Sequence, residues 1–204
     1  LIQIEDRYYN LKHCRVQTSE KGEKKGTGLV VYLSDVTDFE LLRQKYDNEK
    51  LCLAYVRFDN YEDVMKGMSE TTRANISGEV NEVLSKWAEE DNGFISRSNK
   101  EVCLIGFNQA VLRDLMEQKF PVLDSVREIH VGNKITPTVS IGIACEGDNL
   151  EELSQNAVKA LDLALGRGGD QVVVAVDGGT QFFGGTTTVT AKSTRERARI
   201  VAHT

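Results

Sequence analysis

Cysteines and histidines are the residues of this chain whose types could hold a transition metal or form a catalytic pair. Neither type is grouped, because the chain has no C-x-x-C pair and no histidine at ligand spacing from a cysteine. The residues are Cys14, Cys52, Cys103 and Cys145, with His13, His130 and His203. A zinc site or a Cys–His triad is therefore not supported. Because Cys52, Cys103 and Cys145 each lie in an apolar run, we expect reduced thiols buried in the core of a cytoplasmic protein.

A second candidate for chemistry is the glycine-rich segment GRGGDQ at residues 166–171. A glycine-rich loop that precedes a helix binds phosphate through its backbone N–H groups. This segment instead follows a helical stripe of apolar residues that runs from Leu150 to Leu165, and glycine is the usual cap at a helix C-terminus. We therefore favour a helix cap, with phosphate binding as the alternative.

The composition is that of a soluble globular protein. The chain has 204 residues, with 25 basic and 31 acidic side chains and a net charge of −6. This length suffices for a core without metals or disulfides, and the acidic balance argues against nucleic acid as a partner. No apolar run is long enough to span a membrane, so we expect no membrane contact by this chain. It begins at Leu1 without a signal-peptide pattern, and we expect it to be a piece of a longer protein.

Hydrophobic periodicity predicts a hairpin, a helix and then a mixed domain. Strands are expected at 2–17, 28–34, 51–58, 94–97, 102–107, 138–145 and 172–176, and helices at 38–50, 61–90 with a break near Ser69–Thr72, 108–128 with a break at Pro121, and 150–165. The order after residue 50 is an elaborated βαββαβ pattern, the ferredoxin-like arrangement of one sheet with helices mainly on one side. Residues from Gly178 onward are interpreted as a linker, with a new helix starting at 194–202.

This order and two phrases resemble the GGDEF domain, the fold of diguanylate cyclases. TVSIGIA at 138–144 is similar to a strand of that family, and residues 149–174 are similar to its final helix and strand. The resemblance covers roughly residues 50–177. It implies an α/β (α+β) fold with a nucleotide-cyclase sheet.

The catalytic signature departs from the family pattern. Active members carry G-G-D/E-E-F in a hairpin, with an arginine two residues before it, whereas residues 99–103 read Asn-Lys-Glu-Val-Cys after Arg97. The glycines that let the backbone approach phosphates are missing, and Val102 removes an acid that helps to hold two Mg²⁺ ions. The resemblance implies that Arg97 binds the nucleotide and that Glu101 is a remaining metal ligand. The alternative for Arg97 is a surface ion pair.

The other metal-binding strand of the family resembles D-x-D-x-F-K, and residues 56–64 read VRFDNYEDV. Asp59 matches either the first or the second acid, and in the second alignment Arg57 replaces the first. The resemblance implies that Asp59 and Asn60 bind nucleotide and that Asp59 with Glu101 binds Mg²⁺ that accompanies it. The alternative for Asp59 is a cap of the following helix. Because the signature is broken, we predict no synthesis of cyclic-di-GMP.

A narrower resemblance is to the cyclic-di-AMP phosphodiesterase family, whose members combine two membrane helices, a PAS domain, a degenerate GGDEF domain and a DHH/DHHA1 phosphodiesterase. It rests on the hairpin that ends in Asp35-Val36-Thr37, on RFDNYEDV, and on ALGRGGDQVVV followed by FFGG and TRERARIVA. The implied domains are 1–37 as C-terminal PAS strands, 38–50 as a signalling helix, 51–177 as the degenerate GGDEF domain, and 178–204 as a linker to an absent DHH domain.

This resemblance implies a regulatory role in bacterial nucleotide second-messenger signalling. The catalytic residues and the Mn²⁺ ions of the parent hydrolase would lie in the DHH domain, so none is assigned here. ATP binding, or slow hydrolysis of ATP, is a hypothesis for this chain. The implied partners are the chain's own PAS and DHH/DHHA1 domains and a second copy in a homodimer, in a cytoplasmic position below upstream membrane helices. The alternatives are an inert scaffold or dimerisation domain and a weak Mg²⁺-dependent nucleotidase.

Overall fold

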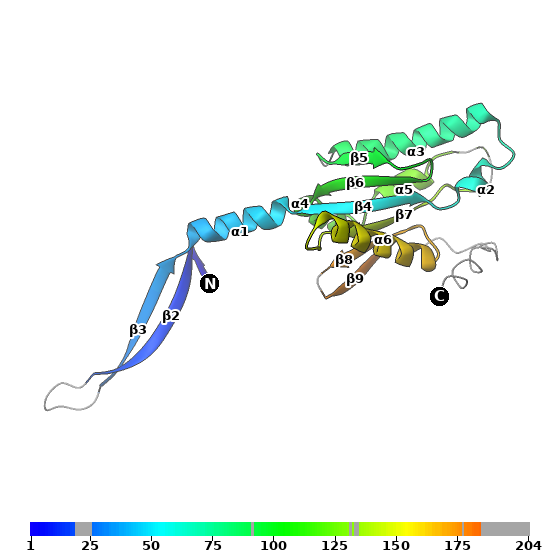
Figure 1. Cartoon of the computed structure of the whole chain (residues 1–204). Coiled ribbons are helices and arrows are strands. Elements are labelled where there is room, and N and C mark those ends of the chain that lie inside the picture. Colours follow the sequence, from blue (N-terminus) through cyan, green and yellow to red (C-terminus); the bar gives the residue numbers. More distant parts are fainter. Residues whose placement is uncertain (19–25, 91, 131, 133–134, 177, 185–204) are drawn as a thin grey trace. The chain divides into compact units, whose positions relative to one another are not determined.

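The computed structural model describes residues 1–18, 26–90, 92–130, 132, 135–176 and 178–184 (Figure 1). The chain divides into two compact units, Leu1–Glu49 and Lys50–Thr204, which are described separately. Within the described residues, no helix combines the length and the apolar character needed to cross a membrane.

The first unit is the predicted hairpin followed by a helix. Its elements are β1 (Ile2–Ile4), β2 (Arg7–Thr18), β3 (Gly26–Asp35) and α1 (Thr37–Glu49), with β1, β2 and β3 in one antiparallel sheet. The strand expected at 2–17 is split by a turn in which Glu5 has a φ of 52°. The Asp35 carboxylate accepts hydrogen bonds from the Thr37 hydroxyl at 2.6 Å and the Thr37 N–H at 3.0 Å, which lower the pKa of Asp35 and fix the start of α1.

The second unit is a mixed sheet covered by helices, which confirms the α+β fold class. Its strands are β4 (Leu51–Phe58), β5 (Phe94–Arg97), β6 (Val102–Asn108), β7 (Val139–Ala144), β8 (Gln171–Val176) and β9 (Gly179–Gly184), and its helices are α2 (Tyr61–Met65), α3 (Glu70–Glu90), α4 (Gln109–Glu117), α5 (Val122–Arg127) and α6 (Leu150–Gly166). The sheet order is β5-β6-β4-β7-β8-β9, and only β7 and β8 pair in parallel among these strands. The predicted breaks between α2 and α3 and near Pro121 are both present.

The alternation of β4 sorts the core onto the two faces of the sheet. Cys52, Ala54, Val56 and Phe58 join a large apolar cluster with side chains from α3, α4 and α5. On the other face, Leu53 packs with residues of α6, which crosses the sheet in Figure 1. The expectation that helices lie mainly on one side holds for α3, α4 and α5, while α6 covers the opposite face.

The interpretation of residues from Gly178 onward as a linker is wrong for Gly179–Gly184. These residues form β9, which pairs antiparallel with β8 from Val176↔Gly179 to Gln171↔Gly184. The Phe183 ring packs edge-on against Phe120 with a centroid distance of 5.1 Å, so the strand is anchored in the apolar core. Glycines at both ends of this short stretch concealed the strand in the sequence. The helix expected at 194–202 lies outside the described residues.

The expectation of reduced cysteines is also wrong for one pair. Cys52 and Cys145 form a disulfide with a Cα–Cα distance of 4.2 Å. The register Leu53↔Ala144 places these two residues opposite each other on β4 and just after β7, although 93 positions separate them in the sequence. Cys103 is buried and free as predicted, and Cys14 is free but exposed.

We predict that Gly142→Ala destabilises the second unit strongly. A Cβ atom at Gly142 would overlap the backbone of Leu161 and Ala157, so α6 must move away from β7. Overpacking against backbone predicts a loss of about 3 kcal/mol in the free energy of unfolding, measured by urea denaturation.

Gly78→Ala in the middle of α3 is the matched control, because a Cβ atom there meets nothing within 4 Å. This variant should gain about 0.5–1 kcal/mol, since alanine restricts the unfolded chain and favours the helix. Equal unfolding midpoints for the two variants would contradict the close packing of α6 on β7.

Candidate functional site

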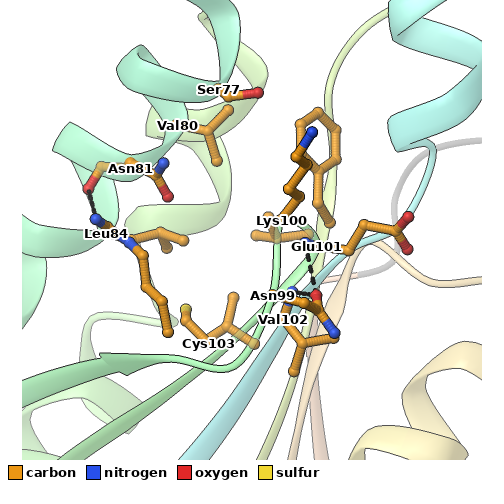
Figure 2. A pocket seen from close by; sticks show the side chains of 13 residues that line it. Ser77, Val80, Asn81, Leu84, Asn99, Lys100, Glu101, Val102 and Cys103 are labelled. Carbon is orange, nitrogen blue, oxygen red and sulfur yellow. Dashed lines mark hydrogen bonds between the residues drawn. The ribbon is translucent and has the colours of Figure 1, made fainter. Parts of the chain in front are cut away.

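A small cleft lies between α3 and the β5–β6 hairpin (Figure 2). Its apolar wall comes from β4, α3, β6 and β7, and its polar rim comes from α3 and the hairpin loop. The apolar residues are Val56, Phe58, Val80, Leu84, Val102, Cys103 and Val139, and the polar ones are Ser77, Asn81, Arg97, Asn99, Lys100 and Glu101. The cleft encloses about 20 Å³, which is room for about one water-sized group.

Asn99 builds the tip of the hairpin. Its side-chain oxygen accepts hydrogen bonds from the N–H groups of Glu101 and Val102, each at 2.8 Å, as Figure 2 shows. The Ser98 N–H also donates to the Val102 carbonyl at 3.1 Å. The backbone donors of Glu101 and Val102 are therefore engaged within the turn, in the segment where active members of the resembled family carry glycines that approach phosphate.

Two cations contribute to the rim of the cleft. The Arg97 Nη2 donates to the carbonyl of Asn81 at 3.3 Å and to the Ser85 hydroxyl at 3.0 Å, and both acceptors are neutral. Lys100 forms no ion pair within the part of the chain that the structure describes. In Figure 2 the Lys100 side chain and the Glu101 carboxylate diverge from the hairpin.

Glu101 faces an arginine instead of a second acid. Its carboxylate lies 3.9 Å from the Arg57 guanidinium, and each side chain is 37% exposed. The Glu101 carbonyl accepts the Phe58 N–H at 2.8 Å, which extends the β4–β6 ladder and holds the two side chains near each other. The positive charge beside this carboxylate is thus supplied by Arg57.

The structure places Asp59 and Asn60 outside the lining of the cleft. Asp59 Oδ2 accepts hydrogen bonds from the Asp170 N–H at 2.9 Å and from the Thr138 hydroxyl at 3.2 Å. Asn60 Nδ2 donates to the Thr136 carbonyl at 2.7 Å, and Asn60 Oδ1 accepts the Thr138 N–H at 3.3 Å. Of the four predicted site residues, Arg97 and Glu101 therefore meet at the cleft, whereas Asp59 and Asn60 fasten β4 to neighbouring loops.

The GRGGDQ segment caps α6, as favoured from the sequence. The N–H groups of Gly168 and Gly169 donate to the carbonyls of Leu165 and Ala164 at 3.1 and 3.0 Å. Gly169 has a φ of 77°, and a Cβ atom there would lie 2.8 Å from Asp59 Oδ2. Glycine is required at this position both by the backbone conformation and by the close approach of the carboxylate.

An ion pair that sequence reasoning missed anchors the same loop. The Arg127 Nε donates to both carboxylate oxygens of Asp170, at 2.9 and 3.1 Å. The side chains are 19% and 6% exposed, so the pair is largely buried. Burial raises the pKa of Asp170, and the hydrogen bonds and charge of Arg127 act in the opposite direction. No spacing in the sequence joins a residue of α5 to the loop before β8.

The residues present do not fit the two Mg²⁺ ions that the cyclase resemblance implies. Asp59 accepts hydrogen bonds from the Thr138 hydroxyl and the Asp170 N–H. Glu101 faces Arg57, and the side chain of Val102 has no atom that could bind a metal. Among the described residues, no group of three or more His, Cys, Asp or Glu side chains is placed to hold a metal ion. We therefore derive no chemistry through a metal at this cleft.

Comparison with family models gives a match over residues 56–182, to the model described as "Cyclic-di-AMP phosphodiesterase GdpP-like, GGDEF domain". Cyclic-di-AMP phosphodiesterase GdpP of Bacillus subtilis is 38% identical over 175 residues, which are 85% of this chain and 27% of that protein. Cyclic-di-AMP phosphodiesterase PdeA of Listeria monocytogenes is 36% identical over 174 residues, which are 85% of this chain and 26% of that protein. The chain thus spans about a quarter of the length of these curated relatives.

Solved structures confirm the fold. The GGDEF domain of DgcB from Caulobacter crescentus, in complex with c-di-GMP, has a TM-score of 0.54 and 19% identity, covering 67% of this chain and 86% of that one. A diguanylate cyclase/phosphodiesterase from Caldicellulosiruptor saccharolyticus has a TM-score of 0.55 and 16% identity, covering 71% of this chain and 87% of that one. At these identities the likeness shows the nucleotide-cyclase fold alone.

We predict that Asp59→Ala lowers stability and does so without any dependence on Mg²⁺. The substitution leaves the Asp170 N–H and the Thr138 hydroxyl without their acceptor. Lost, partly buried hydrogen bonds of this kind predict a loss of about 1–3 kcal/mol in the free energy of unfolding. Thermal melts with Mg²⁺ and with EDTA should show the same shift.

Asp162→Ala on the exposed side of α6 is the control and should change stability by less than about 0.5 kcal/mol. An Asp59→Ala variant as stable as the wild type would contradict the structural role, above all if Mg²⁺ raised the melting temperature of the wild type alone.

Proposed function

Because the chain belongs to the GGDEF domain family of GdpP-like cyclic-di-AMP phosphodiesterases, we propose that it is a regulatory, GGDEF-like part of such an enzyme. One observation carries the proposal, namely that the Glu101 carboxylate in the former cyclase hairpin faces Arg57 at 3.9 Å. A cyclase needs metal-bound acids at this position, because the ions polarise the reacting phosphate and activate the attacking hydroxyl. The domain keeps the fold and has lost the charge pattern on which that chemistry depends.

The proposed ligand of the domain is ATP. Support comes from the cleft rim, where Arg97 donates only to neutral acceptors in the described residues and Lys100 has no carboxylate partner there. Arginine and lysine both bind phosphate oxygens through charge-assisted hydrogen bonds. Hydrolysis of ATP by this chain would be slow at most, because Val102 offers no metal ligand and Glu101 faces Arg57. The two polar residues at the end of β4, Asp59 and Asn60, form hydrogen bonds to neighbouring loops.

The proposed regulation acts on a DHH/DHHA1 domain that hydrolyses cyclic-di-AMP with Mn²⁺ and lies outside this chain. The first unit would be the last strands of a PAS sensor, followed by the signalling helix α1. In a homodimer, the exposed Phe39, Leu42 and Tyr46 of α1 would pack against the second copy, because they recur at helical spacing. The parent protein would be anchored in the membrane, with this part in the cytoplasm.

A scaffold that binds no nucleotide is the second candidate. The observation that favours it is the size of the cleft, about 20 Å³, against several hundred Å³ for an ordinary nucleotide or drug-sized site. A scaffold would hold the sensor and the hydrolase in register without a ligand. The two candidates differ in their response to ATP.

We expect no cyclic-di-GMP when the chain is incubated with GTP and Mg²⁺ at high protein concentration. The reason is electrostatic, because Arg57 repels a metal ion from the Glu101 carboxylate. The measurement is chromatography with mass detection, beside an active diguanylate cyclase as the positive control. A product peak that grows with time would overturn the proposal that cyclase chemistry is lost.

ATP binding should depend on the cleft rim. In calorimetric titrations, Lys100→Gln is expected to weaken ATP binding about tenfold, because one charge-assisted contact to phosphate is removed. Lys159→Gln, on the exposed side of α6, is the matched control and should leave the dissociation constant unchanged. No heat from the wild-type chain with ATP would favour the scaffold instead.

A further inference from the structure

We propose that the cleft recognises the polyphosphate of its ligand, irrespective of the base and without a divalent ion. The inference rests on the proposed binding of ATP and narrows it to a ligand class, namely nucleoside triphosphates of any base together with inorganic polyphosphate. Three features of the described residues support it: the volume of the cleft, the charges on its rim, and the pairing of its one acid.

The enclosed part of the cleft is too small to hold a base. The cleft encloses about 20 Å³, enough for about one water-sized group, whereas pockets that bury an organic ligand measure hundreds of Å³. Val80 and Leu84 of α3 are buried, and Val102 and Cys103 approach them from β6. A purine would have to separate α3 from the hairpin, and this would expose apolar surface that is now buried. Contacts with a ligand therefore fall on the rim.

The rim carries a surplus of positive charge. Arg97 and Lys100 both line it, and Arg57 stands next to its only lining carboxylate, that of Glu101. The whole chain has a net charge of −6, so the positive charge of this rim is opposite in sign to the charge of the protein as a whole. Ser77 and Asn81 of α3 add neutral polar groups beside the cations. Such a set of donors fits a chain of phosphates, which offers many acceptor oxygens at high negative charge.

A metal ion is unnecessary at such a rim. In a metal-dependent site the ion joins protein acids to phosphate oxygens, whereas here Glu101 already faces a guanidinium. Mg²⁺ in solution binds the triphosphate and cancels part of its charge, which lowers its attraction to Arg97 and Lys100. The free triphosphate is therefore the preferred ligand. Two or three exposed charge-assisted contacts predict a dissociation constant on the order of 0.1–1 mM.

The test is a calorimetric titration of the full 204-residue chain with ATP, GTP and inorganic tripolyphosphate, each in EDTA and in excess Mg²⁺. The three dissociation constants in EDTA should agree within about threefold, because only the phosphates are contacted. Excess Mg²⁺ should weaken each about fivefold, and added salt should weaken all three in parallel.

Variants locate the site. Lys100→Gln and Arg97→Gln should each weaken tripolyphosphate binding about tenfold, whereas Glu101→Gln should strengthen it several-fold by removing the rim's acid. Lys159→Gln should have no effect. Lys100 is exposed, so its variant should keep the wild-type melting temperature, which separates a lost contact from a lost fold.

The outcomes separate this inference from the proposed function. ATP binding that requires Mg²⁺, or that exceeds tripolyphosphate binding by more than about tenfold, would overturn the inference and leave ATP regulation standing. Tripolyphosphate binding that is indifferent to both rim variants would also overturn it, since the ligand would then bind elsewhere. An absence of binding by all three ligands would overturn the inference and the ATP proposal together.

Discussion

The register of β4 is the constraint on which the rest of the second unit depends. This strand lies between β6 and β7 and pairs antiparallel with both, so its side chains alternate between two covered faces. A slip of one residue would turn Val56 and Phe58 out of the main core and bring Arg57 into it. The same register fixes the polar residues that follow, because Arg57 is set beside the hairpin and Asp59 beside the loop before β8.

Two sets of polar interactions begin at the end of β4, and they differ in burial and in their effect on the domain. The pair between Arg57 and Glu101 is more than one-third exposed, and exposed ion pairs contribute about 0–1 kcal/mol to stability. Its significance is electrostatic, because it sets the sign of the charge at the cleft. The network of Asp59, Asp170 and Arg127 is more buried and joins β4 to α5 and to the α6–β8 loop. Its significance is structural, because it closes the opposite side of the strand end.

Local patterns sufficed for most of the fold. The strand at 51–58, the break between α2 and α3, the hairpin around residues 98–101 and the cap of α6 were all predictable, since each follows from periodicity or from turn and cap residues within a few positions. Features that depend on distant partners were not. The disulfide of Cys52 with Cys145 requires the β4–β7 register, and β9 requires the apolar contact of Phe183 with Phe120. In the hairpin, the sequence shows Lys100 only as a residue that replaces a glycine of the cyclase motif. The structure places its side chain on the rim of the cleft, where it adds a positive charge.

Asp59 illustrates why a surviving acid in a motif is weak evidence for a surviving metal site. A sequence motif gives only the position of Asp59 at the end of β4. The hydrogen-bond partners of its carboxylate are Thr138 and Asp170, which lie more than 75 positions away in the sequence. A metal ion at Asp59 Oδ2 would have to replace the N–H of Asp170 and the hydroxyl of Thr138, at a cost of about 1–3 kcal/mol for each group left unsatisfied. The fold thus retains an acid where a cyclase would have one and uses it to hold a loop, while the cations on the rim of the cleft, Arg97 and Lys100, come from the β5–β6 hairpin.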